Sequence, residues 1–86
     1  MKIEIIDYLN ENKGYGITIS EIEGNEKVLS NVRYNFDKNI TIEGLNEFRE
    51  MEKYIIDTKE IKKIEKDVTN IIIHTTTKQI IIENWN

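Results

Sequence analysis

Hydrophobic and polar residues alternate along the first half of the chain, which is the pattern of strands with one buried face. Three segments show this alternation: 2–9, 15–22 and 28–36. The longest of them, 28–36, places Val28, Ser30, Val32, Tyr34 and Phe36 on one face. With a short strand at 40–42, residues 1–43 are predicted to form a four-stranded antiparallel β-meander.

The period of the hydrophobic pattern changes after residue 43. Residues recurring at three- and four-residue steps are typical of one stripe of a helix. The residues that recur in this way are Leu45, Phe48, Met51, Ile55 and Ile56. The spacing predicts a helix over 44–57 with Phe48 buried. Glu52 projects into this stripe, and a carboxylate there needs a partner. Arg49, three residues earlier, is the expected one.

A hairpin is predicted at the C-terminal end, within residues 68–86. The segments 68–74 and 79–85 are rich in β-branched residues, and each contains three consecutive isoleucines. Successive side chains of a strand point to opposite faces, so both strands are apolar on both sides. One helix covers one side only, so the other side must meet loops, a second sheet layer, a second copy of the chain or a partner. Residues 59–67 fit either a short helix or a strand.

These elements predict an α+β fold, with a small antiparallel β-sheet of about six strands packed against one main helix. Residues 1–86 provide room for a single domain. The chain contains 18 Ile but no Ala, Pro or Cys, so disulfides and thiolate metal sites are excluded. The absence of an apolar run of about 20 residues argues against a membrane span. The N-terminus shows no signal peptide, and we expect a cytoplasmic protein.

Few residues in the sequence suggest catalysis. His74 is the one histidine and lies within a predicted strand, with no partner for acid–base chemistry nearby. Ser20 and Ser30 do not lie on a nucleophile elbow. No spacing of carboxylates resembles a metal-binding loop, and no cofactor motif is present. We therefore expect a protein that binds rather than catalyses, without cofactor or metal.

A binding surface is predicted on the polar face of the 44–57 helix. At the angular step of a helix, four acids and one tyrosine fall together opposite the apolar stripe: Glu43, Glu47, Glu50, Tyr54 and Asp57. This face is predicted to dock a protein with a basic surface, although an ordinary solvated helix face is the simpler alternative. Trp85, near the chain end, either caps the core or contacts the partner.

Net charge is −4, with 16 acidic and 12 basic residues, which argues against direct binding to nucleic acid. In its small size, acidity and Asn/Ile/Lys-rich composition, the chain resembles the phage and plasmid inhibitors of bacterial defence, such as anti-CRISPR proteins. That resemblance implies an inhibitor that occupies a basic or nucleic-acid-binding surface of a larger protein. The alternative is a structural module that forms a homodimer through its apolar C-terminal hairpin.

Overall fold

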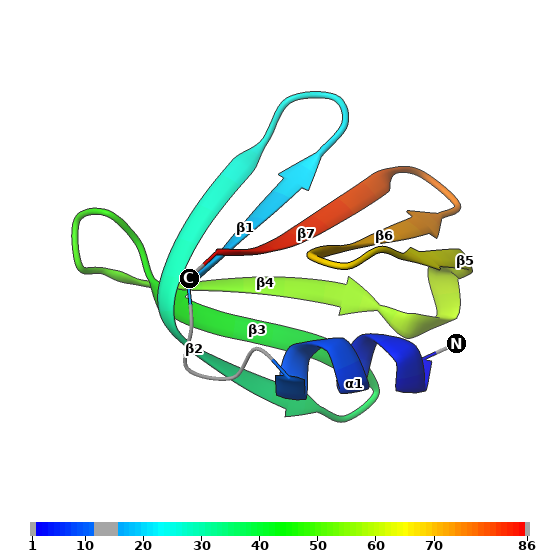
Figure 1. The fold of residues 1–86 in the computed structure, drawn as a ribbon, viewed down its shortest axis with the longest axis horizontal. Helices are drawn as coiled ribbons and strands as arrows, with labels where there is room; N and C mark the ends of the chain where they lie inside the picture. Colours follow the sequence, from blue (N-terminus) through cyan, green and yellow to red (C-terminus); the bar gives the residue numbers. More distant parts are fainter. Residues whose placement is uncertain (1, 12–15, 86) are drawn as a thin grey trace.

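The computed structural model describes residues 2–11 and 16–85, which contain one α-helix and seven strands (Figure 1). In chain order the elements are α1 (Lys2–Glu11), β1 (Gly16–Glu21), β2 (Glu26–Phe36), β3 (Asn39–Leu45), β4 (Met51–Asp57), a short 3₁₀ helix η1 (Thr58–Glu60), β5 (Ile61–Lys66), β6 (Asn70–Thr75) and β7 (Gln79–Trp85). The strands form one antiparallel sheet in the order β4-β3-β2-β1-β7-β6-β5. The predicted α+β class is confirmed, with seven strands instead of six.

Strand β2 is shared by the two halves of the sheet. Residues 26–29 pair with β1, whereas residues 30–36 pair with β3, and the register of this second pairing shifts between Ser30 and Arg33. Asn31 lies in this irregularity with a φ of 52°, a value that few non-glycine residues adopt. The extra residue of a β-bulge bends a strand and increases its twist. Figure 1 shows β2 curving from the top of the molecule to its base.

The bulge also changes which side chains of β2 face the core. Leu29 and Val32 are both buried, although they are three residues apart, and Val28 is exposed. The predicted face of Val28, Ser30, Val32, Tyr34 and Phe36 is therefore wrong at its beginning. Strict alternation fails because the bulge inserts one residue between the two halves of the strand.

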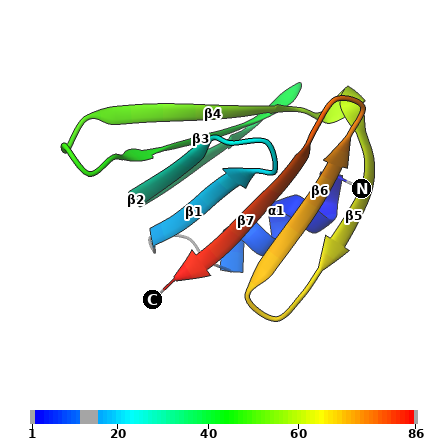
Figure 2. The same ribbon diagram turned by 90° about the horizontal axis from the view of Figure 1, so that it is seen from above.

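Helix α1 closes the concave side of the sheet. Ile5, Tyr8 and Leu9 are buried, at the spacing of one helical face. The Tyr8 hydroxyl donates to the backbone oxygens of Thr69, at 2.9 Å, and Ile82, at 3.1 Å. Seen from above, α1 lies beneath β7 and β6 (Figure 2). Burial raises the pKa of Tyr8 to about 12, so the hydroxyl remains a donor.

The strand predicted over 2–9 is therefore a helix. Alternation of Ile3 and Ile5 suggested a strand, but Ile3 is exposed and the buried positions follow a period of three and four. The residues that follow, Asn10-Glu11-Asn12-Lys13-Gly14, have the composition of a turn, and they lie partly in α1 and partly outside the described residues. Tertiary packing decides such short segments, because the helix must fill the open side of an isoleucine-rich sheet.

The helix predicted over 44–57 is instead a hairpin made by the end of β3, a turn and β4. β4 pairs with β3 from Asn39↔Asp57 to Leu45↔Met51. Tyr54 and Ile56 are buried, while Met51 and Ile55 are exposed, which is the period of a strand. The helical spacing was coincidental, because the β-branched Ile55 and Ile56 gain more by pairing with Thr41 and Ile40.

The C-terminal hairpin is present as β6 and β7, and its isoleucines divide between the two faces of the sheet. The four isoleucines that point inward are fully buried: Ile71, Ile73, Ile80 and Ile82. Ile72 and Ile81 lie opposite each other on the outer face and are half-buried. The open segment 59–67 forms most of η1 and all of β5.

Two substitutions, one at an exposed and one at a buried residue, distinguish this fold from a helix over residues 44–57. Phe48→Ala should change the free energy of unfolding by no more than about 0.5 kcal/mol, because Phe48 is 75% exposed in the β3–β4 turn. Ile42→Ala, at a fully buried position of β3, should cost about 2–5 kcal/mol. Urea unfolding followed by circular dichroism measures both. A large loss for Phe48→Ala would contradict the hairpin.

Candidate functional site

The structure separates the residues that the sequence grouped on one acidic face. Glu43 lies on the outer face of β3, with its carboxylate 3.9 Å from the Lys53 ammonium. Tyr54 points inward from β4. Asp57 ends β4, where its carboxylate accepts a hydrogen bond from the backbone N–H of Lys59 at 3.0 Å and caps η1. The predicted acidic stripe is absent from the described residues, because residues 44–57 form the end of β3, a turn and β4 and no helix.

Glu47 and Glu50 remain together, in the turn between β3 and β4. We call residues 46–50 the hairpin tip. The backbone of Trp85 pairs with Gly16 of β1. The predicted roles of its side chain, as a cap of the core or a contact with a partner, lie outside what the structure describes. Glu52, expected to pair with Arg49, instead binds Lys27 on β2, with 2.8 Å between Nζ and Oε1. Both residues point to the same side of the sheet, whereas Arg49 lies in the turn.

The hairpin tip is held by hydrogen bonds that converge on Asn46. The Asn46 Oδ1 accepts from the backbone N–H groups of Phe48, at 2.8 Å, and Glu50, at 2.9 Å. The Asn46 N–H donates to the Glu50 oxygen at 2.9 Å, and Arg49 N–H donates to the Asn46 oxygen at 3.0 Å. Asn side chains favour such turns because they replace a backbone acceptor. The tip therefore has one defined conformation.

The tip presents hydrophobic side chains to solvent. Phe48 is 75% exposed and Met51, which follows the tip, is 55% exposed. Beside them is a shallow depression of about 160 Å³, lined by Val28, Ser30, Leu45, Asn46 and Glu47. Figure 1 shows this hairpin projecting away from the rest of the molecule. An aromatic ring on a fixed, projecting turn is an arrangement suited to contact with another macromolecule.

Arg49 occupies a left-handed backbone conformation at the tip, with a φ of 63°. This conformation costs a non-glycine residue of order 1 kcal/mol, and glycine or asparagine is the usual occupant. In the sequence, Arg49 lies between two acidic residues, Glu47 and Glu50. The tip thus combines both charge signs with one exposed aromatic residue.

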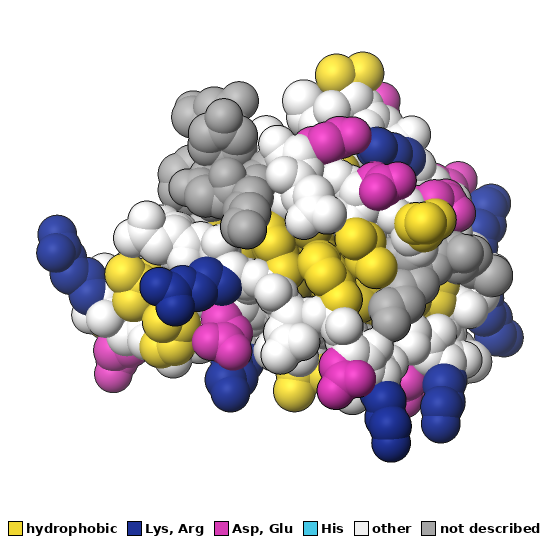
Figure 3. Space-filling view, turned by 90° about the horizontal axis from the view of Figure 1, so that it is seen from below, with side chains coloured by type: hydrophobic (Ala, Val, Ile, Leu, Met, Phe, Trp, Pro, Cys, Tyr) yellow, Lys and Arg dark blue, Asp and Glu magenta, His cyan; other side chains and the backbone are white. Residues whose placement is uncertain are grey.

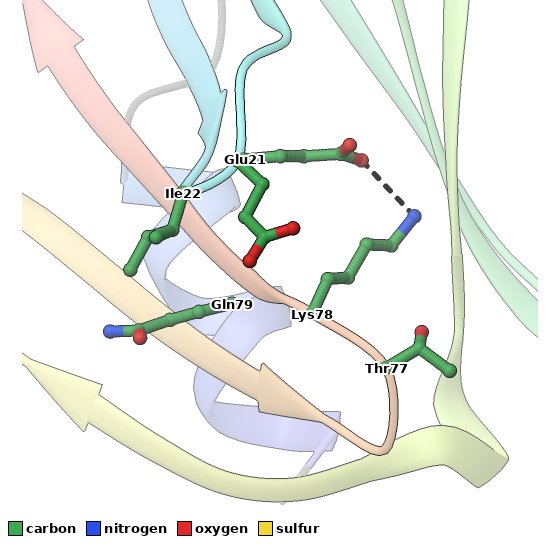
Figure 4. Close-up of a pocket in the computed structure, with 6 residues that line it drawn as sticks. Glu21, Ile22, Thr77, Lys78 and Gln79 are labelled. Atoms are coloured by element: carbon green, nitrogen blue, oxygen red, sulfur yellow. Dashed lines mark ion pairs between the residues drawn. The ribbon is translucent and has the colours of Figure 1, made fainter.

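A second cluster joins three separate segments at one end of the sheet: Glu21 at the end of β1, Tyr54 on β4 and Lys78 before β7. The Tyr54 hydroxyl donates to Glu21 Oε2 at 2.5 Å, and the Lys78 ammonium lies 3.1 Å from the same oxygen. The ammonium is also 5.8 Å from the centroid of the Tyr54 ring. Figure 4 shows Glu21 and Lys78 reaching toward each other beside a cleft of about 290 Å³.

The contacts of this cluster shift the pKa values of Glu21 and Tyr54 in opposite directions. The Tyr54 hydrogen bond, followed by that from Lys78, lowers the pKa of Glu21 from its ordinary 4.5. Burial, followed by the bond to Glu21, raises the pKa of Tyr54, so its hydroxyl stays protonated and donates. Each polar group is matched by another within the cluster. The cluster ties β4 to β1 and to the β6–β7 turn, far apart in sequence, and pattern analysis had singled out Tyr54 alone.

His74 pairs with Glu65 on the outer face of the sheet, with 2.8 Å between Nε2 and Oε2. This hydrogen bond, followed by the charge of Lys63, lowers the pKa of Glu65. The three residues lie side by side on β5 and β6 and are open to solvent. This is an ordinary cross-strand charge pairing.

One face of the molecule combines hydrophobic and charged side chains. On the face seen from below, hydrophobic side chains show through the middle of the surface, with charged side chains around them (Figure 3). Within residues 2–11 and 16–85, no group of three or more His, Asp or Glu side chains could hold a metal ion. In the same part of the chain, no helix is long and apolar enough to cross a membrane.

No family model, curated protein or solved structure matches the chain.

The Glu21 cluster makes stability depend on pH. A carboxylate whose folded pKa is below its unfolded value contributes stability above the unfolded pKa, and loses it as pH falls through the folded pKa. Near neutral pH, the free energy of unfolding of the wild-type chain should therefore exceed that of the Glu21→Gln variant. This difference should shrink as pH falls below 4.5. Urea titrations at several pH values measure this. Glu23→Gln, at an exposed neighbouring position, is the control, and a difference that stays constant with pH would contradict the assignment.

Proposed function

We propose that the chain is a non-catalytic binding protein that engages a larger protein with a basic surface through the tip of the β3–β4 hairpin. The observation that carries this proposal is Phe48, a large aromatic residue that is 75% exposed on a turn fixed by four hydrogen bonds. Burial of such a ring in a partner's pocket would release its solvent-exposed area from water.

A fixed turn favours binding because little conformational freedom is lost on association. The bonds to Asn46 hold the backbone on both sides of Phe48, so the ring is presented from a defined position. Met51 and the depression beside Leu45 extend the apolar contact next to the ring. Few interface residues contribute most of a binding energy, and an aromatic anchor surrounded by weaker contacts is their usual arrangement.

Charge supports a basic partner. The tip holds two acids, Glu47 and Glu50, against one base, Arg49, and the chain as a whole carries a net charge of −4. Acidic groups of this kind steer a basic surface toward encounter. A surface that binds nucleic acid is rich in Lys and Arg, so an acidic tip that occupied it would exclude the phosphates. Inhibition of a nucleic-acid-binding protein is therefore the form of binding that we propose.

The test begins with an extract of the cells in which the chain is made. Proteins of this extract that bind a heparin column are eluted, which gives a fraction enriched in proteins with basic surfaces. They are passed over the immobilised wild-type chain, over Phe48→Ala, and over Val68→Ala, which removes a 94% exposed hydrophobic residue elsewhere. The proposal expects a protein retained by wild type and Val68→Ala and lost by Phe48→Ala. That protein, purified, should lose nucleic acid when the chain is added. If Phe48→Ala retains the same proteins as wild type, the proposal is wrong.

Phe48→Ala should act on the stability of the complex, because an anchor contributes through burial. Dissociation from the purified partner should accelerate by about tenfold or more, with a smaller change in the association rate. Surface plasmon resonance separates the two rates. Equal dissociation rates for Phe48→Ala and wild type would show that the ring lies outside the contact.

Reversing the two tip acids should act on encounter. The double variant Glu47→Lys, Glu50→Lys should associate about tenfold more slowly at low salt, and the difference should fall as salt screens the charges. The fold should be preserved, since both side chains are exposed. The exposed pair Glu4→Lys, Glu11→Lys on α1 gives the same change of net charge at another place. Equal slowing by both pairs would show that net charge, and not the tip, steers association.

A further inference from the structure

The sheet ends in two edge strands, β4 and β5, and the two edges differ in chemistry. Exposed edges can pair with another chain, and lysines placed along an edge oppose this. Of the six residues in β5, three are lysines: Lys62, Lys63 and Lys66. β4 carries one lysine, Lys53, and its exposed side chains include Met51 and Ile55. Of the two edges, β4 is therefore the one with fewer lysines, although it also carries the acids Glu52 and Asp57.

The far edge of β4 has no strand hydrogen-bonded to it among the described residues. In the strand order, β3 is its one neighbour among the described strands. Beside the end of this edge is a cavity of about 110 Å³, which Ile55, Ile56 and Asp57 line together with Glu60, Thr75, Lys78 and Ile80. Ile55 itself is 55% exposed. A β-branched residue in a strand, exposed beside an unpaired edge, is a typical feature of a pairing surface.

The sequence of β4 is complementary to itself in one register. Paired residues of two antiparallel strands point to the same face, so a two-fold axis relating two copies of β4 must pass through a residue. An axis at Ile55 sets Ile55 against Ile55, and Lys53 against Asp57 in both directions. An axis at Lys53 would set two lysines together, and an axis at Tyr54 would set Lys53 against Ile55. One register alone thus joins apolar with apolar and opposite charges with each other.

We propose that β4 pairs antiparallel with β4 of a second copy of the chain, with the two-fold axis at Ile55. The pairing would extend the sheet continuously across both copies and cover Ile55 on the outer face. Because the axis is at Ile55, this surface is separate from the hairpin tip. The two tips would project from opposite ends of the paired strands, which leaves each Phe48 accessible.

Light scattering during size-exclusion chromatography tests the pairing on the full chain at tens of micromolar. Wild type should have twice the 10.2 kDa mass of one chain. Ile55→Lys and Ile55→Glu should each have the mass of one chain, because like charges meet at the axis. An equimolar mixture of the two should recover the doubled mass, because opposite charges then meet. Ile22→Lys, which changes an isoleucine of similar exposure (57%) in the β1–β2 turn, should keep the wild-type mass.

Each alternative result overturns the proposal. A wild-type chain that remains a monomer, an Ile55→Lys chain that remains a dimer, or a mixture that stays monomeric would exclude pairing at Ile55. Circular dichroism shows whether each variant is folded. Ile55→Thr keeps a β-branched side chain, so it preserves the strand should the charged variants unfold. Its dimer should dissociate at higher concentrations than the wild-type dimer, and equal dissociation would overturn the proposal.

Discussion

The bulge in β2 is the constraint on which the rest of the structure depends. β2 pairs with β1 through residues 26–29 and with β3 through residues 30–36, and the register of the β2–β3 pairing shifts near Asn31, between Ser30 and Arg33. Gly44 on β3 permits the close approach, because a Cβ there would lie 2.8 Å from the Cβ of Leu29 and 3.0 Å from the Ser30 oxygen. The resulting bend turns two halves of one sheet toward a common core.

The bend determines where each other element packs. It leaves an open side between the two halves, which α1 fills with Ile5, Tyr8 and Leu9. It also brings the inner face of β4 near the end of β1, so Tyr54 reaches Glu21. A flat sheet would separate these strands, which are three positions apart in the strand order. The core helix and the polar cluster are both consequences of one inserted residue.

The hydrophobic pattern of the sequence correctly predicted those strands that alternate clearly or are rich in isoleucine. The segments that became β1, β2, β6 and β7 were placed from alternation and β-branched residues, since these strands pair with near neighbours in sequence or carry dense isoleucine. Segments 2–9 and 44–57 were assigned to the wrong class. The spacing of Ile5, Tyr8 and Leu9 fitted a helix as well as a strand, and the contact that decides between them, with Thr69 and Ile82, is far away in sequence.

The candidate sites show the same limit and explain it physically. Glu47 and Glu50 were placed on the polar face of a helix, and Phe48 was assigned to the core, because helical spacing hid the turn built on Asn46. Glu21 and Lys78 could not be found from pattern, because their partner Tyr54 lies on a strand brought to them only by the bend. The sheet that bends but does not close keeps two edges and a projecting hairpin. The lysines of β5 oppose pairing at one edge, and the two association surfaces that we propose are the β4 edge and the hairpin tip.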